Sequence, residues 1–227
     1  MSTTRIYLVR HGATRLTAED RFSGDIGVDL SEDGRSQAAR LGARLQPEGI
    51  TAIYCSPLSR TVETARIIGD PIGLRPQTRD GLREIAHGHW EGMSRRDVET
   101  TFAAEYAQWS EDPFTFAPEG GESGVAVLAR ALPALREIVV AHAGERVVVV
   151  SHKATIRLLL SSLLGFDARG YRDRLDQAPG CLNVVDFRDP VHARLMLFND
   201  TSHYASQPRS AERSLSKWWD TPGGVRP

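Results

Sequence analysis

Arg10, His11 and Gly12 directly follow a short apolar run, residues 6–9, which predicts a β-strand that ends where these three residues begin. The guanidinium of Arg10 can clamp a phosphate, and Gly12 lets an anion approach the backbone because it has no side chain. The imidazole of His11 can attack phosphorus. The tripeptide alone is a weak signal, so this interpretation depends on what other segments contribute.

Two further polar segments also follow predicted strands. Arg60 closes the segment 56–60 after the predicted strand 51–55, and His152 follows the β-branched run 147–150. The carboxyl ends of parallel strands share one edge of a sheet, where open α/β sheets bind their ligands. Arg10, Arg60, His11 and His152 would then converge. Such a cluster is costly to assemble without an anion, and a phosphate dianion suits it.

Glu84 supplies the remaining function, because a carboxyl group beside the phosphorus can protonate a leaving oxygen and later deprotonate water. The reaction would have two steps: His11 takes the phosphoryl group, and water then takes it from His11. Arg10, Arg60 and a protonated His152 would hold the phosphoryl oxygens and stabilise the transition state. This chemistry requires no metal and no cofactor.

The elements that must position these groups alternate along the chain. Helices are predicted from residue 31 to 45, over 58–68, over 123–143 with an interruption or kink near Pro133, and over 155–164; late strands are predicted over 183–187 and 194–198. This alternation predicts a three-layer α/β/α sandwich with a mostly parallel central sheet. We expect one domain over residues 1–205 and a loose C-terminal tail over 206–227. Residues 86–120, with one short helix near 99–109, are expected to form a small insertion over the active site.

The composition is that of an ordinary globular protein, with 41% hydrophobic and 25% charged residues among 227. A net charge of -1 gives no general attraction for nucleic acid or an anionic membrane. Cys55 and Cys181 define no disulfide framework, and we find no signal peptide or transmembrane stretch. We therefore expect a cytoplasmic protein that acts on a small-molecule phosphate ester, with no nucleic-acid or membrane partner. The sequence leaves open whether the chain forms a homo-oligomer.

Further motifs accompany these residues, and together they are specific. They are Arg10-His11-Gly12-Ala13-Thr14, Arg21-Phe22-Ser23-Gly24, Leu30-Ser31-Glu32-Asp33-Gly34, Ser56-Pro57-Leu58-Ser59-Arg60-Thr61 with Thr64-Ala65, Glu84 with Gly88-His89-Trp90-Glu91-Gly92, and Ser151-His152. With them the chain, from residue 5 to about 200, resembles the histidine phosphatase superfamily, also called the phosphoglycerate-mutase-like family. The resemblance implies that His11 is the phosphorylated nucleophile, that Arg10, Arg60 and His152 form the phosphate pocket, and that Glu84 is the proton donor.

The same resemblance places further phosphate or substrate contacts at Thr17, Ser23 and Gly24. Two positions depart from the family pattern. Lys153 stands where glycine is common, and its ammonium could reach the phosphate or an acidic group on the substrate. His87 stands where the family often has an aromatic residue, which affects the pocket wall. The 88–92 segment is more similar to the small phosphatases than to the mutases.

Several alternatives stay open. A phosphoglycerate-type mutase would return the phosphoryl group from His11 to a second hydroxyl, and a non-catalytic module would only bind a phospho-ligand. Glu91 is the alternative to Glu84 as proton donor. His87 and His89 could suggest a metal pair, but no cysteine or carboxylate partners accompany them at ligand spacing. Cysteine-dependent phosphatases need five residues between their cysteine and arginine, whereas Cys55 and Arg60 have four between them.

Overall fold

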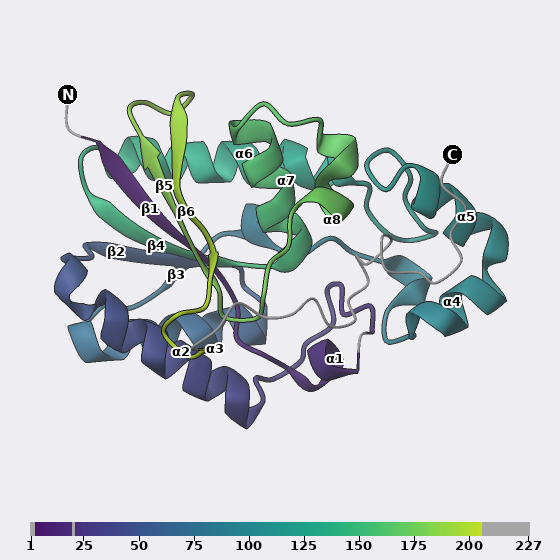
Figure 1. Cartoon of the computed structure of the whole chain (residues 1–227), viewed down its shortest axis with the longest axis horizontal. Helices are drawn as coiled ribbons and strands as arrows, with labels where there is room; N and C mark the ends of the chain where they lie inside the picture. Colours follow the sequence, from purple (N-terminus) through teal and green to yellow (C-terminus); the bar gives the residue numbers. More distant parts are fainter. Residues whose placement is uncertain (1–2, 20, 206–227) are drawn as a thin grey trace.

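The computed structural model describes residues 3–19 and 21–205. A six-stranded sheet in the order β3-β2-β4-β1-β5-β6 forms its centre (Figure 1). All pairings among the first four strands of that order are parallel, and β5 runs antiparallel to both of its neighbours. The strands are β1 (Thr4–Arg10), β2 (Ala52–Cys55), β3 (Gln77–Thr78), β4 (Arg146–Ser151), β5 (Leu182–Phe187) and β6 (Ala193–Asp200).

Helices cover both faces of the sheet, which confirms the predicted α/β class with a mostly parallel sheet. In Figure 1, α6 and α7 lie above the sheet and α2 and α3 lie below it. The helices are α1 (Arg15–Ala18), α2 (Glu32–Leu45), α3 (Ser59–Gly69), α4 (Arg95–Thr101), α5 (Ala103–Glu111), α6 (Gly124–Ala141), α7 (Lys153–Leu163) and α8 (Tyr171–Arg174). Short 3-10 turns occur at Gln46–Glu48, Asp70–Ile72, Asp80–Leu82, Gly88–Trp90 and Ala168–Gly170.

The alternation of side chains along β1 divides the core into two halves. Ile6 and Leu8 are completely buried in a cluster with residues of α6 and α7, whereas Tyr7 and Val9 pack with residues of α2 and α3. Successive side chains of a strand point to opposite faces, so a strand covered on both faces must be apolar throughout. This double burial explains the unbroken apolar runs of β1 and β4.

The register of the parallel strands brings their carboxyl ends together. Arg10 pairs with Ser151 across β1 and β4, and Cys55 pairs with Val150 across β2 and β4. The residues that follow each strand therefore start from neighbouring points on one edge of the sheet. This edge carries the predicted catalytic residues.

Some predicted elements differ from the structure. Of the two alternatives predicted at Pro133, the interruption is wrong, because α6 runs through this residue as one element. Val127 and Ala131 before it and Leu135 and Ile138 after it are all buried. A kink at Pro133 stays a prediction. The pattern also misses β3, a two-residue exposed edge strand, and the one-turn helices α1 and α8. Elements this short carry no periodicity that a sequence could reveal.

The segment 86–120 contains two helices, α4 and α5, where the sequence predicts one. Ser94 starts α4 with a capping box, in which its side chain and that of Asp97 each accept from the other's backbone N–H. A separate aromatic cluster holds this region, with Trp90 and Phe22 fully buried among the rings of Tyr106 and Trp109. The expected C-terminal tail lies outside the described residues. Among those described, no helix has the length and apolar character to cross a membrane.

Candidate active site

His11 is buried and held in one tautomer at the end of β1. Its Nδ1 lies 2.8 Å from the carbonyl oxygen of Gly12, which can only accept, so Nδ1 carries the proton and Nε2 keeps a free lone pair. Its backbone N–H donates to Ser151 in β4 at 3.0 Å. Gly12 is required here because a Cβ on it would lie 2.4 Å from the carbonyl oxygen of Gly34. The hydrogen bond at Nδ1 therefore leaves Nε2 as the ring nitrogen of His11 that has an available lone pair.

His152 and Arg60 meet His11 from the ends of β4 and β2. The two imidazole rings lie 5.2 Å apart, edge to face. Arg60 Nε donates to His152 Nδ1 at 3.3 Å, and His152 Nε2 lies 2.8 Å from the hydroxyl of Ser56. Arg60 and His152 are almost completely buried. The structure thus brings together these three predicted residues.

Arg10 approaches from the same edge. Its guanidinium donates to the carbonyl oxygen of Gln177 at 2.5 Å, and its Nε is enclosed without a hydrogen-bond partner. Lys153 begins α7 on this side. Although partial burial alone would raise the pKa of Asp176, the positive charges of Arg157, Lys153 and Arg10 and a hydrogen bond from Gln177 N together lower it. Lys153 therefore adds its charge to that of Arg10 at this end of the sheet.

Glu84 caps the helix that follows His152. Its carboxylate accepts from the backbone N–H groups of Ala154 and Thr155, each at 3.2 Å, and from the Thr155 hydroxyl at 3.1 Å. Helix N-termini favour negative charge and leave backbone donors that need acceptors. This position puts the carboxyl group beside His152 at the start of α7. The negative charge of Glu84 opposes the lowering of the pKa that burial imposes on Arg10 and Arg60.

The electrostatics of the cluster keep both imidazoles neutral. Burial, reinforced by the charges of Arg60 and Arg10, lowers the pKa of His11 well below its usual value. Burial and Arg60 do the same to the pKa of His152. A neutral His11 is the nucleophilic form. The protonated His152 expected from the sequence is disfavoured by the protein's own groups, and a phosphate dianion would act in the opposite direction by favouring the imidazolium.

The loop after α1 forms the opposite wall. Arg60 donates to the carbonyl oxygens of Gly24 and Ile26, each at 2.7 Å, so this loop is fixed to Arg60. Glu91 fixes it from behind: its Oε1 accepts from Asp25 N and from His87 N, both at 3.0 Å. Gly24 has a positive φ of 44°, and a Cβ there would lie 2.0 Å from Glu91 Oε1. Glu91 thus clamps the loop at Asp25 to His87 through one carboxylate oxygen.

The remaining predicted contacts are less directly joined to the cluster. Thr17 Oγ1 lies 2.9 Å from Thr14 Oγ1, and the carbonyl oxygen of Ser23 accepts from Ile26 N. Within residues 3–19 and 21–205, no hydrogen bond joins Thr17 or the Ser23 side chain to His11. Gly24 takes part through its carbonyl oxygen on Arg60. No group of three or more potential metal-ligating side chains occurs within residues 3–19 and 21–205.

Several residues that position the predicted catalytic groups were not predicted from the sequence. Ser56 orients His152, and Thr64 accepts from Gly12 N at 3.2 Å. Both lie inside the 56–65 motif, which is a signal that could have found them. Thr155 and Gln177 have no comparable local signal, because their contacts to Glu84 and Arg10 depend on segments about 70 and 167 residues apart.

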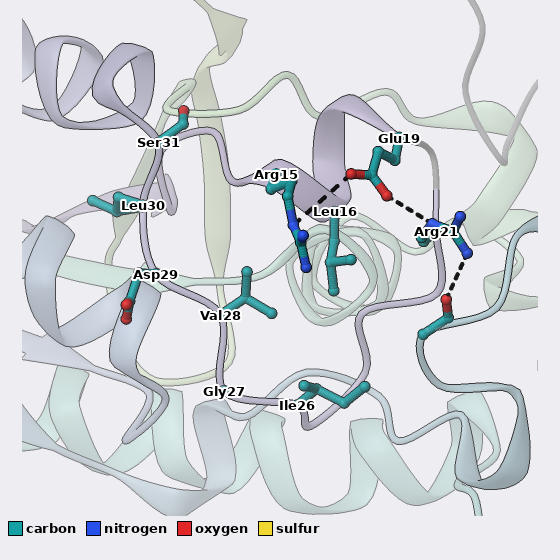
Figure 2. A pocket seen from close by; sticks show the side chains of 11 residues that line it. Arg15, Leu16, Glu19, Arg21, Ile26, Gly27, Val28, Asp29, Leu30 and Ser31 are labelled. Carbon is teal, nitrogen blue, oxygen red and sulfur yellow. Dashed lines mark hydrogen bonds and ion pairs between the residues drawn. The ribbon is translucent and has the colours of Figure 1, made fainter.

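A pocket of about 760 Å³ lies beside this cluster and contains none of the five predicted catalytic residues. Figure 2 shows Arg15 and Leu16 of α1 on one side of it and the segment 26–31 on the other, with Glu19 linking Arg15 and Arg21. Ile26 lines this pocket and also binds Arg60 through its carbonyl oxygen. Ile26 therefore belongs both to the lining of this pocket and to the loop that Arg60 holds.

Comparisons with known proteins agree with this geometry. The model of the histidine phosphatase superfamily, branch 1, matches residues 6–201. Phosphoserine phosphatase 1 of Hydrogenobacter thermophilus is 36% identical over 163 residues, covering 72% of this chain and 77% of that protein. Glucosyl-3-phosphoglycerate phosphatase of Mycolicibacterium vanbaalenii is 34% identical over 172 residues, covering 73% and 76%.

Among solved structures, YhfR of Bacillus stearothermophilus superposes with a TM-score of 0.83 at 30% identity, covering 88% of this chain and 98% of that one. These matches confirm the family expected from the sequence, its small-phosphatase branch and the enzyme class. The chain belongs to the histidine phosphatase superfamily, branch 1.

Proposed function

We propose that this chain is a metal-independent phosphomonoesterase that hydrolyses a small phosphorylated metabolite through a phosphohistidine on His11. The observation that carries the proposal is the fixed tautomer of His11. Its Nδ1 is bound to the Gly12 carbonyl, so Nε2 presents its lone pair next to His152 and Arg60. A module that only binds phosphate needs no nucleophile prepared in this way.

In the first step, His11 Nε2 forms a bond to phosphorus while the bond from phosphorus to the alcohol oxygen breaks. Glu84, as the carboxylic acid, gives its proton to that oxygen, and the alcohol leaves. In the second step, Glu84 takes a proton from water, whose oxygen attacks phosphorus and breaks the bond to Nε2. The products are the alcohol and inorganic phosphate, and both residues return to their starting forms.

Arg10 and Arg60, together with His152 once the bound dianion favours its imidazolium form, stabilise the charge that spreads over the phosphoryl oxygens. Arg10, Arg60 and His152 are the proposed phosphate ligands, since all three lie at the strand ends around His11. Burial away from water makes each such contact stronger than on a surface. Further ligands of the phosphate or substrate are proposed at Thr17, Ser23, Gly24 and Lys153.

The substrate class follows from the relatives, which are named for small phosphorylated compounds. A cytoplasmic site of action is supported by Cys55 and Cys181, both buried as free thiols. A domain over residues 1–205 with an insertion over 86–120 remains part of this proposal. So does action on a small molecule without a nucleic-acid or membrane partner.

Hydrolysis of p-nitrophenyl phosphate in EDTA, set beside a 3-phosphoglycerate mutase assay with a bisphosphate primer, tests the proposal. We expect EDTA-resistant hydrolysis without mutase activity. His11→Ala should reduce turnover by at least about 10⁴-fold and abolish the trapped phosphoenzyme. His192→Ala is the matched control, because that imidazole is 63% exposed and pairs with Asp189.

Each other outcome contradicts the proposal in a distinct way. Mutase activity with little hydrolysis favours the mutase, for which the family offers a precedent. Phosphate-ester binding without turnover by either assay favours the binding module. Near-full activity of His11→Ala rejects the phosphohistidine mechanism itself.

A further inference from the structure

Arg130 of α6 places its guanidinium against the loop that carries Glu84. Its Nη1 donates to the carbonyl oxygens of Gly81 and Arg83, at 3.0 and 2.9 Å, and its Nη2 donates to the carbonyl oxygen of Glu84 at 2.8 Å. Its Nε and Nη2 also donate to the two carboxylate oxygens of Glu122, at 2.9 and 2.7 Å. A guanidinium has five N–H donors, so all the donors of this side chain are used within the protein.

Glu122 extends the same clamp to the residues that follow Glu84. Its Oε2 accepts from Ala86 N at 3.1 Å, and its own backbone N–H donates to the Ala86 carbonyl oxygen at 2.8 Å. Although partial burial alone would raise the pKa of Glu122, its hydrogen bonds from Arg130 and Ala86 N and the nearby positive charges lower it. Glu122 is therefore a carboxylate at neutral pH, and one ion pair holds the backbone on both sides of Glu84.

The loop also packs closely against α6. A Cβ on Gly81 would lie 2.6 Å from both the carbonyl oxygen of Arg130 and the Cβ of Ala134, so glycine lets the turn Asp80–Leu82 lie directly on the helix. Leu82 is completely buried in the core cluster that α6 helps to form. The support under the loop is thus a packed helix, which can hold a residue in place more precisely than another loop could.

The backbone of Glu84 needs this support because its carboxylate is held from a different element. The carboxylate accepts from Ala154 N and Thr155 N at the start of α7. Protonation weakens the hydrogen bonds that a carboxylate accepts, so a Glu84 anchored only through its side chain would be released whenever it becomes the acid. The clamp from α6 holds carbonyl oxygens, whose hydrogen bonds do not depend on that proton.

We propose that Arg130, supported by Glu122, is the positioning residue of the proton donor: it fixes the backbone at Glu84 so that the carboxyl group stays within reach of the leaving oxygen in both protonation states. Because its five donors are already engaged, Arg130 acts through Glu84 and not on the phosphate. This inference rests on the proposed function, since it concerns the step in which Glu84 protonates the alcohol.

Two substitutions of Arg130, each made in the unmodified chain and in Glu84→Gln, test this role. Arg130→Ala removes the whole clamp, and Arg130→Lys keeps the charge but loses the planar fork. Arg136→Ala is the matched control, because Arg136 also lies on α6 and donates from Nε to a backbone carbonyl oxygen, that of Pro190, at 3.1 Å. The measured quantity is kcat for glycerol 3-phosphate, an alkyl ester, and for p-nitrophenyl phosphate.

We expect Arg130→Ala to lower kcat for the alkyl ester by about 10²-fold and that for p-nitrophenyl phosphate by less than about tenfold. In Glu84→Gln the same substitution should cost less than about threefold on either ester, because Glu84 then supplies no proton. Arg130→Lys should show the same pattern with a loss of about tenfold on the alkyl ester, and it carries the test if Arg130→Ala does not fold. Arg136→Ala should stay within about twofold of the unmodified chain.

Three results would overturn the proposal. They are equal losses on the two esters, no loss on either, and a loss on the alkyl ester that is as large in Glu84→Gln as in the unmodified chain. A residue that only stabilises the fold would lower both activities together and would act independently of Glu84.

Amide hydrogen exchange measures the clamp without the reaction. Exchange at Ala86 N, which donates to Glu122, should accelerate by about tenfold or more in Arg130→Ala and not in Arg136→Ala. If the unmodified chain hydrolyses neither ester, that acceleration would support the clamp on the Glu84 loop while phosphatase function would be rejected. Unchanged exchange in an active enzyme would reject the clamp alone, and unchanged exchange in an inactive chain would reject both.

Discussion

The ends of β1, β2 and β4 and the segment from residue 86 to 116 both contribute to the candidate site but are built differently. The strand ends are fixed by the ladder of a sheet whose β1 and β4 are buried on both faces. The segment 86–116 depends on its own aromatic cluster and on a few side-chain clamps such as Glu91. We therefore expect the first region to supply the catalytic groups and the second region to select the leaving group.

Exposure supports this division. His152 and Arg60 have at most 1% of their surface accessible, as have Trp90 and Phe22 of the aromatic cluster. Between these two buried groups, Glu84 and His87 are only partly buried. Glu84 and His87 are thus partly accessible, as Thr17, Ser23 and Lys153 also are, and we expect the alcohol of the substrate to contact this accessible part of the site.

The largest effect that probes this comparison is on Glu84. Glu84→Gln should lower kcat for an alkyl phosphate by about 10²–10⁴-fold, because an amide cannot give a proton to a poor leaving group. The loss for p-nitrophenyl phosphate should be less than about tenfold, since that leaving group needs little protonation. The measurement is kcat for a series of esters of different leaving-group pKa.

Equal losses along the series would mean that Glu84 acts by capping α7 and not as an acid. A melting curve of the variant separates that case, because the carboxylate accepts from Ala154 N and Thr155 N. The result would move Glu84 from the chemical region to the structural one.

The second test breaks the clamp between the two regions. Glu91→Ala leaves Asp25 N and His87 N without their acceptor and should lower the free energy of unfolding by about 2–4 kcal/mol. It should also lower kcat/KM by about tenfold, because the loop 24–26 holds Arg60. Urea unfolding and steady-state kinetics measure these effects.

Glu91→Gln is the conservative partner, since its amide oxygen can still accept from both donors, and it should stay within about 1 kcal/mol of the unmodified chain. Glu119→Ala is the exposed control, because that side chain is 86% accessible. Inactivity of Glu91→Gln in a fully folded protein would contradict a clamping role and revive Glu91 as the proton donor.

The smallest expected effect concerns His87. The pKa of His87 is lowered to about 4 in the folded chain and is about 6.5 when unfolded, so only the unfolded chain binds this proton between these values. The free energy of unfolding must then fall as pH decreases from about 6.5 toward 4. His11 and His152 act in the same direction.

Between pH 7 and pH 5, His87→Phe should lose about 1–2 kcal/mol less stability than the unmodified chain. Urea unfolding at the two pH values measures the difference. An identical pH dependence of the two proteins would mean that His87 titrates as a solvated histidine, so its ring would be open to water.

Much of the fold could be predicted because its periodic patterns are long. The apolar runs of β1 and β4 and the capped start of α2 at Ser31 are local signals, and the structure places these elements within one or two residues of the prediction. The division of residues 86–120 into α4 and α5 could not be predicted. There, aromatic packing between distant rings outweighs local periodicity.

By itself, the sequence determined the groups that can do the chemistry and, through strand ends in a parallel sheet, that His11, Arg60 and His152 would converge. Only the tertiary structure decided their protonation states and the contacts that hold them in place. The His11 tautomer, the neutral His152 and the Glu91 clamp on His87 all depend on contacts between segments or on burial. A sequence pattern records which groups are present, whereas desolvation and hydrogen-bond partners arise only when the chain has packed around them.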